Sequence, residues 1–378
     1  MNIEKIIDDT KAYFCIECGI CTGSCPISRI DSNFSPRLMV ENLLLGEEDD
    51  VIRSKKLWSC LTCKACSSRC PASVDFNQFI MRSRIEAKLL GENGTCTHAG
   101  TLKAMMELQT TEFFRKSKEW IPENFKVTDR GKFYYFVGCL PFFNIIFKDI
   151  NVKSIDIAVS ALKIFNFFGI EPVISENERC CGHDHYWIGE FDVFKTLAEY
   201  NLKTINNSGA EVVFFTCPEG YNMFKEVYPL YFGKLDFECV YLPNFVNEKL
   251  RDGDFSFLET EDKVTYQDPC RLGRFMGIYE EPRNLIQNIP GIVFKDMPRN
   301  RANSLCCGSS NWINCTSVNK LIQVERLKEA ENTGAETLIT GCPKCEIHLN
   351  CALFDRDNNY NIRIKDITTL IAEKLGGK

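Results

Sequence analysis

Two runs of four cysteines with the same spacing constrain this chain more than any other feature. Both runs read C-x2-C-x2-C-x3-C-P. Their cysteines are Cys15, Cys18, Cys21 and Cys25 in the first run, and Cys60, Cys63, Cys66 and Cys70 in the second. Three thiolates at this spacing can wrap one face of an iron–sulfur cube, and the proline directs the fourth toward a neighbouring cluster. The runs therefore predict two [4Fe–4S] clusters.

The spacing also predicts how the cysteines are shared. Because the fourth cysteine of each run serves the other cluster, we expect one ligand set of Cys15, Cys18, Cys21 and Cys70, and another of Cys60, Cys63, Cys66 and Cys25. Zinc is the alternative, but zinc sites use paired C-x2-C hooks and need no third or fourth cysteine at this spacing. Two neighbouring clusters would form a one-electron relay.

Cysteine is the residue type that stands out in the composition, with 21 among 378 residues. Disulfide scaffolds this rich are short and secreted, so a long chain of this kind is expected to bind metal. The formal net charge of −6 argues against non-specific binding to nucleic acids. No stretch has the roughly 18 apolar residues of a membrane helix, and the N-terminus, MNIEKIIDDTK, does not resemble a signal peptide. We expect a cytoplasmic protein, or one held at the inner face of the membrane by a partner.

Apolar periodicity predicts helices around the cysteine runs. The stripe formed by Leu38, Val40, Leu43, Leu44 and Leu45 indicates a helix from Pro36 to Trp58. Residues 2–14 and 76–90 are also expected to be helical. Residues 1–95 are therefore predicted to form an all-helical two-cluster ferredoxin domain, followed by a linker helix region over residues 96–130.

The remainder of the chain repeats internally. Residues 207–211, NSGAE, match residues 332–336, NTGAE, and each segment precedes an apolar strand and a Cys-Pro pair. Upstream, Cys180-Cys181-Gly182 matches Cys306-Cys307-Gly308. The repeat predicts two related domains, residues 131–255 and residues 256–378.

Strands and helices alternate within each copy. In the first copy we expect strands near 132–137, 171–174, 211–216 and 237–241, and helices near 154–168, 189–207 and 219–228; in the second, a strand over 263–266 and helices near 316–332 and 366–375. Phe133 to Phe147 is expected to be a buried strand that runs into a turn. Alternation predicts a parallel sheet flanked by helices, with the cysteines just past the strand ends. The expected fold class is α+β multidomain: an all-helical two-cluster ferredoxin domain and two repeated α/β domains.

The cysteine pattern of the copies, C-x(30–40)-C-C-G-x(~35)-C-P-x-C, resembles the cysteine-rich CCG domain of heterodisulfide reductase. A ferredoxin domain followed by two CCG domains resembles the D subunit of that enzyme, which is a natural fusion of its C and B subunits. The same layout occurs in the iron–sulfur subunits of anaerobic glycerol-3-phosphate dehydrogenase and glycolate oxidase. The resemblance covers essentially the whole chain.

The second copy is complete, with Cys270, Cys306, Cys307, Cys342 and Cys345. The resemblance implies that these five cysteines hold a noncubane [4Fe–4S] cluster, through which they act on a disulfide. Adjacent thiolates point apart, so the Cys-Cys pair would bridge or serve two irons. Gly308 would let the backbone pass close to the cluster.

The first copy departs from this pattern. Cys139, Cys180, Cys181 and Cys217 are present, but Gly220 stands in place of the fifth cysteine. Four ligands could hold a cubane, an altered noncubane cluster, or nothing. His183 or His185 could replace the missing ligand, although a histidine hydrogen-bonded near a cluster is the more usual arrangement.

Other residues near the motifs have weaker assignments. Arg271 and Arg274 could contact an anionic substrate, as could Arg299, Arg301 and Lys344, but surface charge is the plainer interpretation for most of them. Four cysteines have no partner in the pattern and are expected to be buried free thiols: Cys96, Cys239, Cys315 and Cys351.

Two functions from different classes fit the sequence. In the first, electrons enter at the ferredoxin clusters and reach the second CCG site, which reduces a disulfide; by resemblance this is the mixed disulfide of coenzyme M and coenzyme B. The electron donor would be a membrane cytochrome b, a flavoprotein or a hydrogenase assembly. In the second, the chain is the electron-transfer subunit of a flavin-dependent glycerol-3-phosphate or 2-hydroxyacid dehydrogenase. No G-x-G-x-x-G follows a predicted strand, so a flavin would belong to a partner.

Overall fold

A computed structural model describes residues 2–309, 311–355 and 360–377, which form two compact units. Unit 1 consists of residues 1–108, 182–194 and 305–323, and unit 2 of residues 109–181, 195–304 and 324–378. Unit 1 thus joins the N-terminal region to one short segment from each sequence copy. The boundaries drawn from the repeat divide the chain differently and stay a prediction.

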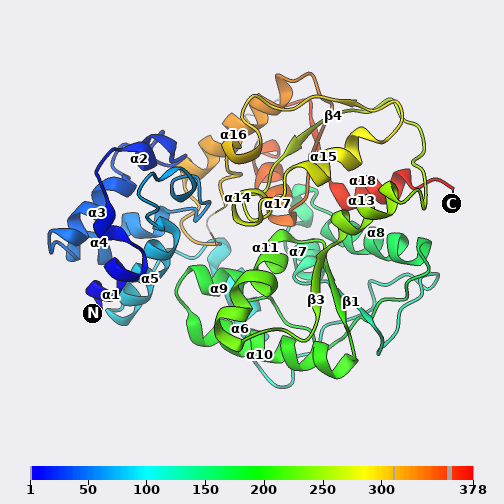
Figure 1. Ribbon diagram of the computed structural model, residues 1–378, viewed down its shortest axis with the longest axis horizontal. Coiled ribbons are helices and arrows are strands. Elements are labelled where there is room, and N and C mark those ends of the chain that lie inside the picture. The colour runs from blue at the N-terminus through cyan, green and yellow to red at the C-terminus, as the bar shows by residue number, and fades with distance from the viewer. Residues whose placement is uncertain (1, 310, 356–359, 378) are drawn as a thin grey trace. The chain divides into compact units, whose positions relative to one another are not determined.

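The N-terminal region of unit 1 is helical, as predicted (Figure 1). Its α-helices are α1 (Ile3–Asp9), α2 (Ile20–Ser24), α3 (Pro36–Leu44), α4 (Asp49–Ile52), α5 (Phe76–Leu89) and α6 (Thr101–Leu108), and its 3-10 turns are η1 (Ala12–Phe14), η2 (Lys55–Ser59), η3 (Ser67–Arg69) and η4 (His98–Gly100). Side chains fix two of the helix starts. Ser35 accepts the Leu38 N–H at the start of α3, and Asp75 accepts the N–H groups of Asn77 and Gln78 at the start of α5.

The single helix predicted from Pro36 to Trp58 is wrong in its length. α3 ends at Leu44, the chain turns at Gly46, and α4 and η2 follow as separate short elements. The expected apolar stripe is therefore only partly buried: Val40 and Leu43 lie in the core, whereas Leu38, Leu44 and Leu45 are exposed.

Unit 2 contains two parallel sheets, one from each sequence copy, which confirms the predicted α/β repeat. The first sheet has the order β1 (Phe133–Phe136), β2 (Val212–Phe215), β3 (Glu238–Tyr241). The second has the order β5 (Val293–Phe294), β4 (Lys263–Gln267), β6 (Thr337–Thr340), β7 (Arg363–Asp366). All neighbouring strands are parallel, so their carboxyl ends meet at one edge of each sheet.

Helices flank both sheets. Those of unit 2 are α7 (Leu140–Ile146), η5 (Lys148–Ile150), α8 (Ser154–Phe167), α11 (Pro218–Asn222), the π-helix η6 (Met223–Val227), α12 (Tyr228–Phe232), α13 (Leu242–Arg251), α14 (Gly273–Met276), α15 (Glu280–Gln287), η7 (Arg301–Asn303), α17 (Pro343–Leu353) and α18 (Ile367–Lys374). α9 (His183–Trp187) lies in unit 1, and α10 (Phe191–Ser208) and α16 (Ser317–Glu331) begin there and continue into unit 2.

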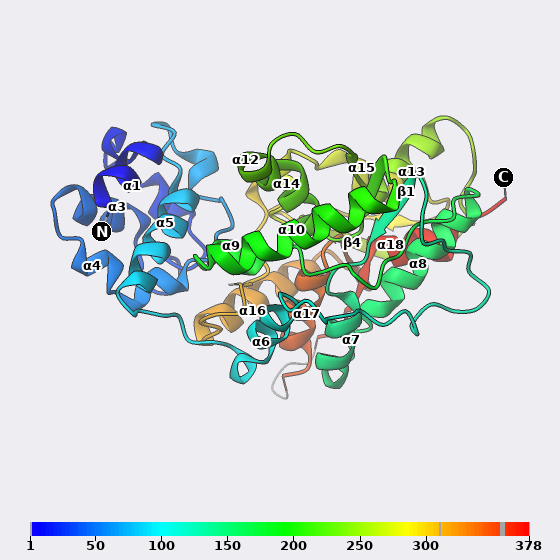
Figure 2. The same cartoon turned by 90° about the horizontal axis from the view of Figure 1, so that it is seen from below.

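The two copies pack against each other reciprocally within unit 2. α8 of the first copy contacts α18 of the second, and α15 of the second contacts α13 of the first (Figure 2). α8 and α15 follow the first long strand of their copies, and α13 and α18 follow the last strand. Each contact thus joins the helix after the first long strand of one copy to the helix after the last strand of the other. One apolar core runs between the sheets, and Phe165, Leu285 and Ile371 are fully buried in it.

Two local predictions in the first copy need correction. The strand predicted near 171–174 is reduced to Val173, which bridges Thr128 and Tyr134. The turn expected within Phe133–Phe147 is instead the helix α7. Its Pro141 lies in the first helical turn, where a proline costs no hydrogen bond.

Candidate iron–sulfur sites

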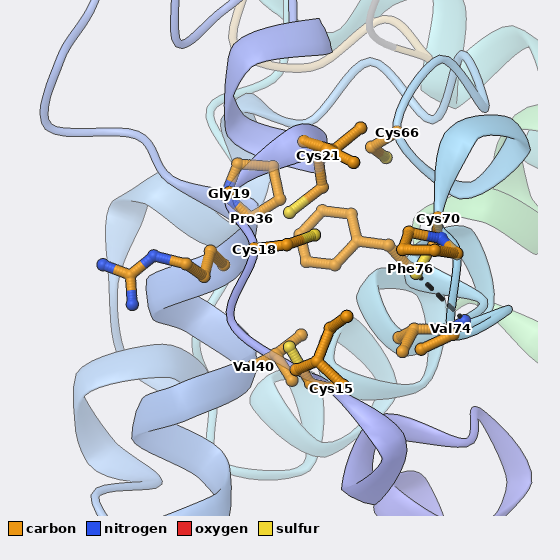
Figure 3. A pocket seen from close by; sticks show the side chains of 15 residues that line it. Cys15, Cys18, Gly19, Cys21, Pro36, Val40, Cys66, Cys70, Val74 and Phe76 are labelled. Carbon is orange, nitrogen blue, oxygen red and sulfur yellow. Dashed lines mark hydrogen bonds between the residues drawn. The ribbon is translucent and has the colours of Figure 1, made fainter.

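One cavity in unit 1 gathers five thiols from both cysteine runs. Cys15, Cys18, Cys21 and Cys70 line it together with Cys66 and Phe76, and Figure 3 shows these side chains around the same space. The Cys70 sulfur also accepts the Val74 N–H at 3.4 Å. Burial, joined by the charge of Cys15, raises the pKa of Cys21. Four soft donors around one space are the donor set that an iron–sulfur cluster requires.

The other four thiols of the runs form a second, more buried group. Burial, joined by the charges of Cys63 and Cys60, raises the pKa of Cys25 to about 12. Cys66 also has a raised pKa, caused first by burial and then by Cys60, Cys63 and Cys25. Thiols held this closely repel one another as thiolates, and a bound metal removes that penalty because it deprotonates a coordinating thiol. Cys66 has Cys60, Cys63 and Cys25 as neighbours but also lines the cavity of the first group. The division of the eight cysteines into two ligand sets stays a prediction.

The two runs share an unusual backbone. Glu17 and Thr62 are both left-handed, with φ of 52° and 49°, and so are the equivalent Gly19 and Lys64, with φ of 76° and 64°. A left-handed non-glycine residue costs roughly 1 kcal/mol or more, and such residues collect at functional sites. The matching conformations show that the runs form the same loop twice.

A buried arginine holds the second thiol group. Arg84 of α5 is fully buried and donates to the carbonyl oxygens of Leu57, Cys60 and Trp187 at 2.9–3.3 Å. Burial lowers its pKa to about 10, although the Cys60 charge favours the cation. The sequence reasoning missed Arg84; its only signal was an arginine among the apolar residues of a predicted helix.

The four cysteines of the first CCG copy converge in unit 2. The Cys139 and Cys180 sulfur atoms lie 3.7 Å apart. A hydrogen bond with the Cys180 thiol, joined by burial and by the charges of Cys139 and Cys217, raises the pKa of Cys181. Tyr228 donates to the Cys181 carbonyl oxygen at 3.2 Å. The donor set is therefore four thiols at the carboxyl ends of β1 and β2, which fits a cluster in spite of the missing fifth cysteine.

A buried ion pair fixes the loop that carries Cys139. Both carboxylate oxygens of Glu178 accept backbone N–H groups, from Val137 at 3.1 Å and from Gly138 at 2.8 Å. Lys116 donates to Glu178 at 2.6 Å and to the Gly138 carbonyl at 2.8 Å. Neither side chain is more than 5% exposed. Sequence analysis identified neither residue.

The cysteines of the second copy fall in both units. Cys270, Cys342 and Cys345 belong to unit 2, and Cys306 and Cys307 to unit 1. Cys342 lies two residues after the end of β6, as Cys217 does after β2, and each occupies the N-cap position of the helix that follows. Burial, followed by the charge of Cys342, raises the pKa of Cys217. The five-cysteine ligand set stays a prediction.

Gly220 lies against aromatic rings. A Cβ there would meet Phe215 at 3.5 Å and Phe136 at 3.7 Å, which are ordinary contacts. The neighbouring Glu219 pairs with Lys344 at 2.9 Å, so this ion pair joins α11 of the first copy to α17 of the second.

Arg271 and Arg274, beside the intact motif, make contacts with other groups of the protein. Arg274 donates to the carbonyl oxygens of Ser304 and Ala302, and the Arg271 guanidinium stacks on the Phe275 ring at 4.2 Å. Both are buried, so surface charge is the wrong interpretation for them. Lys344 is also buried, whereas Arg299 and Arg301 are partly exposed and paired with carboxylates. Substrate contact by Arg271 and Arg274 stays a prediction.

The CCG glycines have a packing role. Gly182 and Gly308 are left-handed, with φ of 72° and 82°, and a Cβ would come within 2.9 Å of Phe194 and Asn319 respectively. The close approach is thus to α10 in the first copy and to α16 in the second. His183 and His185 lie in unit 1; His185 Nδ1 is 2.6 Å from Glu190. The location of either histidine near a cluster stays a prediction.

Of the four cysteines outside the motifs, which are predicted to be buried, only some are. Cys239 is buried and Cys351 is half-buried, whereas Cys96 and Cys315 are exposed. The last two lie on irregular segments that pair through a bridge between Cys96 and Ile313, at the edge of the described unit 1.

Two protein families match this chain. Residues 11–74 match the 4Fe-4S dicluster domain, and residues 133–225 and 264–350 match the cysteine-rich domain called CCG. The fold, the gathered thiols and these matches define the class: an iron–sulfur protein built from a dicluster ferredoxin region and two CCG domains.

Curated relatives narrow the assignment. The chain is 31% identical to the D subunit of the dihydromethanophenazine:CoB–CoM heterodisulfide reductase of Methanosarcina acetivorans, over 68% of this chain and 62% of the relative. It is 23% identical to the B subunit of the fumarate reductase (CoM/CoB) of Methanothermobacter marburgensis, over 63% of this chain and 45% of that one. The chain thus spans less than two thirds of the length of these relatives. It belongs to the family of the heterodisulfide reductase D subunit.

Among solved structures, a hypothetical protein from Helicobacter pylori has a similar fold. Its TM-score is 0.55 at 14% identity, and the match covers 98% of this chain and 71% of that one. Among the described residues, none of the helices has the length and apolarity that crossing a membrane requires.

Proposed function

We propose that this chain is the iron–sulfur subunit that reduces a small mixed disulfide to two thiols in a heterodisulfide reductase-type complex. The convergence of Cys139, Cys180, Cys181 and Cys217, beside Cys342 of the complete copy, is the observation that carries this proposal. It gives a thiol-lined centre at the strand ends, in addition to the two groups of the ferredoxin region.

The chain's own residues would divide the work. The eight cysteines of the two runs would hold two [4Fe–4S] clusters, and Arg84 would stabilise the loop of the buried one. Cys270, Cys306, Cys307, Cys342 and Cys345 would hold a noncubane [4Fe–4S] cluster, and the first copy would hold a further cluster on its four thiols. When bound, these groups supply one-electron transfer and a site for substrate sulfur.

The reaction needs two electrons and two protons. The S–S bond of the substrate breaks and two S–H bonds form, with electrons from a one-electron donor and protons from water. The substrate proposed by similarity is the mixed disulfide of coenzyme M and coenzyme B, which is the pair named for the Methanosarcina relative. The donor would be a membrane cytochrome b, a flavoprotein or a hydrogenase-type subunit.

An anaerobic assay with reduced viologen and the mixed disulfide tests the function. We expect viologen oxidation with the release of two thiols per disulfide. No turnover, together with a copurifying flavoprotein, would instead favour the electron-transfer subunit of a flavin-dependent dehydrogenase.

Cys345→Ser probes the proposed reducing site. Loss of the fifth thiolate should lower turnover at least 100-fold, while the electron paramagnetic resonance signals of the two ferredoxin clusters remain. Cys239→Ser is the matched control, because Cys239 is a buried thiol outside every predicted ligand set. Full activity in Cys345→Ser would contradict the site.

A further inference from the structure

A second, polar cavity lies in unit 2, away from the residues assigned to ligand sets. Its volume is about 390 Å³, and it is open to solvent. Its lining comes from the segment before β1, the loop before Cys180, and the second half of α10: Glu112, Arg115, Asp129, Ser175, Asn177, Arg179, Tyr200, Lys203, Thr204, Asn207 and Ser208. Three of these side chains are cationic.

Arg179 is the centre of this cavity wall. It is only 1% exposed, and its guanidinium is sandwiched between Phe114 and Tyr200, with its carbon 4.8 Å and 5.0 Å from the two ring centroids. Its Nη1 donates to the Asn177 carbonyl at 3.0 Å, but its buried Nε has no hydrogen-bond partner. Throughout the described chain, no carboxylate pairs with this arginine.

Two neighbouring cationic side chains add to the excess of positive charge in this cavity wall. Arg115 uses its Nη1 for the carbonyl oxygens of Glu112 and Phe114, and neither it nor Lys203 is paired with a carboxylate in the part of the chain described. Burial, followed by the charge of Arg115, lowers the pKa of Arg179. Of the two acids in the lining, Asp129 is held by Lys118 at 2.7 Å, and Glu112 is exposed.

A buried cation without a counter-charge is costly, and an anion bound beside Arg179 would remove part of that cost. A guanidinium with free N–H donors suits the oxygens of a phosphate, sulfonate or carboxylate group, and stacking on two rings holds its plane in place. The hydroxyl groups of Ser175 and Thr204 lie on the same wall, and that of Thr204 donates to the Asn177 carbonyl at 3.4 Å. The volume falls in the range of small-molecule sites and exceeds what an inorganic anion needs.

We propose that this cavity binds the oxyanion group of a small organic molecule through Arg179, Arg115 and Lys203. This site does not depend on whether a disulfide is the substrate, and no ligand-set cysteine lines it. It is next to one in the chain, however. Asn201 accepts the backbone N–H of Arg179 at 2.7 Å and donates to the Cys180 carbonyl at 3.0 Å, so the same side chain holds the backbone of both residues.

Titration calorimetry at constant ionic strength tests the proposal, with phosphate, methanesulfonate and acetate as separate probes. We expect one saturable site for at least one probe. Tighter binding of phosphate or methanesulfonate would identify a tetrahedral anion as the preferred group, and tighter binding of acetate a carboxylate.

The variants are chosen so that they fold. Arg115 and Lys203 are exposed, so Arg115→Met and Lys203→Met should fold and should each weaken binding about 5- to 10-fold, as expected for the loss of one charge-assisted hydrogen bond. Arg179→Lys keeps the positive charge but loses the planar guanidinium group, which can donate two parallel hydrogen bonds. It should weaken binding more than 10-fold. Lys163→Met is the control, since Lys163 is an exposed lysine of α8 outside the cavity.

Three results would overturn the proposal. One is the absence of saturable binding to the wild type for all three probes. Another is an equal loss of affinity in Lys163→Met, which would indicate non-specific attraction. The last is unchanged affinity in both Arg115→Met and Lys203→Met.

Discussion

At the scale of single residues, buried charges hold the loops that carry the cysteines. Arg84 binds three carbonyl oxygens around Cys60, and Glu178 binds two backbone N–H groups beside Cys139. Each charge thereby binds backbone groups in or next to the segments that carry the cysteines. The cost of burying it is offset by several short hydrogen bonds.

Glu178→Ala should be strongly destabilising. It leaves the Lys116 charge buried without its partner and removes the acceptor of two N–H groups, at a cost of roughly 3–5 kcal/mol. Denaturant unfolding followed by circular dichroism measures the loss. Glu171→Ala, an exposed glutamate of the same copy, is the control and should change stability by less than about 0.5 kcal/mol. Similar losses of unfolding free energy in both variants would count against a stabilising role of the Lys116–Glu178 ion pair.

At the scale of elements, the two copies diverge after their Cys-Pro pairs. In the second copy α17 continues unbroken over Pro343–Leu353. In the first, the equivalent stretch is divided into α11, the π-helix η6 and α12, where one helix near 219–228 had been predicted. A π segment shifts the residues after it around the helix axis. The missing cysteine at Gly220 therefore lies at the start of the stretch whose geometry changed.

Gly220→Cys should fold normally without gaining a metal ligand. The new Cβ makes only ordinary contacts with the rings of Phe215 and Phe136, so the thiol enters an apolar environment. Iron and sulfide analysis should give the wild-type content, and thiol titration of the unfolded protein one extra cysteine. An increase in bound iron would show that the first copy lacks only this ligand.

At the scale of the whole molecule, buried acids couple stability to pH. Burial raises the pKa of Asp366 to about 7, and burial together with the Asp366 charge raises that of Glu346 to about 8. The folded state therefore keeps protons that the unfolded state has lost. The stabilisation from these two groups is complete below pH 4, and it is lost as the pH rises through 7 and 8.

The melting temperature of the anaerobic protein should fall as the pH rises from 5 to 8. The loss of stability is about 4 kcal/mol for each group in all, and it is spread between the ordinary carboxyl pKa of about 4 and the raised pKa of each acid. The double variant Asp366→Asn with Glu346→Gln stays neutral, so its melting temperature should depend less on pH and exceed that of the wild type at pH 9. Scanning calorimetry across this range gives the comparison. Parallel curves for the two proteins would mean that other groups control the pH dependence.

Much of the fold and of the candidate sites could be predicted because the signals are local. The spacing within each cysteine run fixes how the backbone wraps, and the equal left-handed pairs Glu17/Thr62 and Gly19/Lys64 follow from it. The alternation of apolar strands and helices predicted two parallel sheets, and the repeat placed one in each copy.

The sequence by itself determined which cysteines belong to repeated motifs and that strands and helices alternate around them, since both depend on neighbours along the chain. Only the tertiary structure decided which charges are buried. Arg84, Lys116, Glu178 and Arg179 look like ordinary surface residues in sequence, but burial depends on packing between distant segments. Long-range packing also decided that the four thiols of the incomplete copy converge, because Cys139 and Cys180 come from separate segments that only the packed sheet brings together.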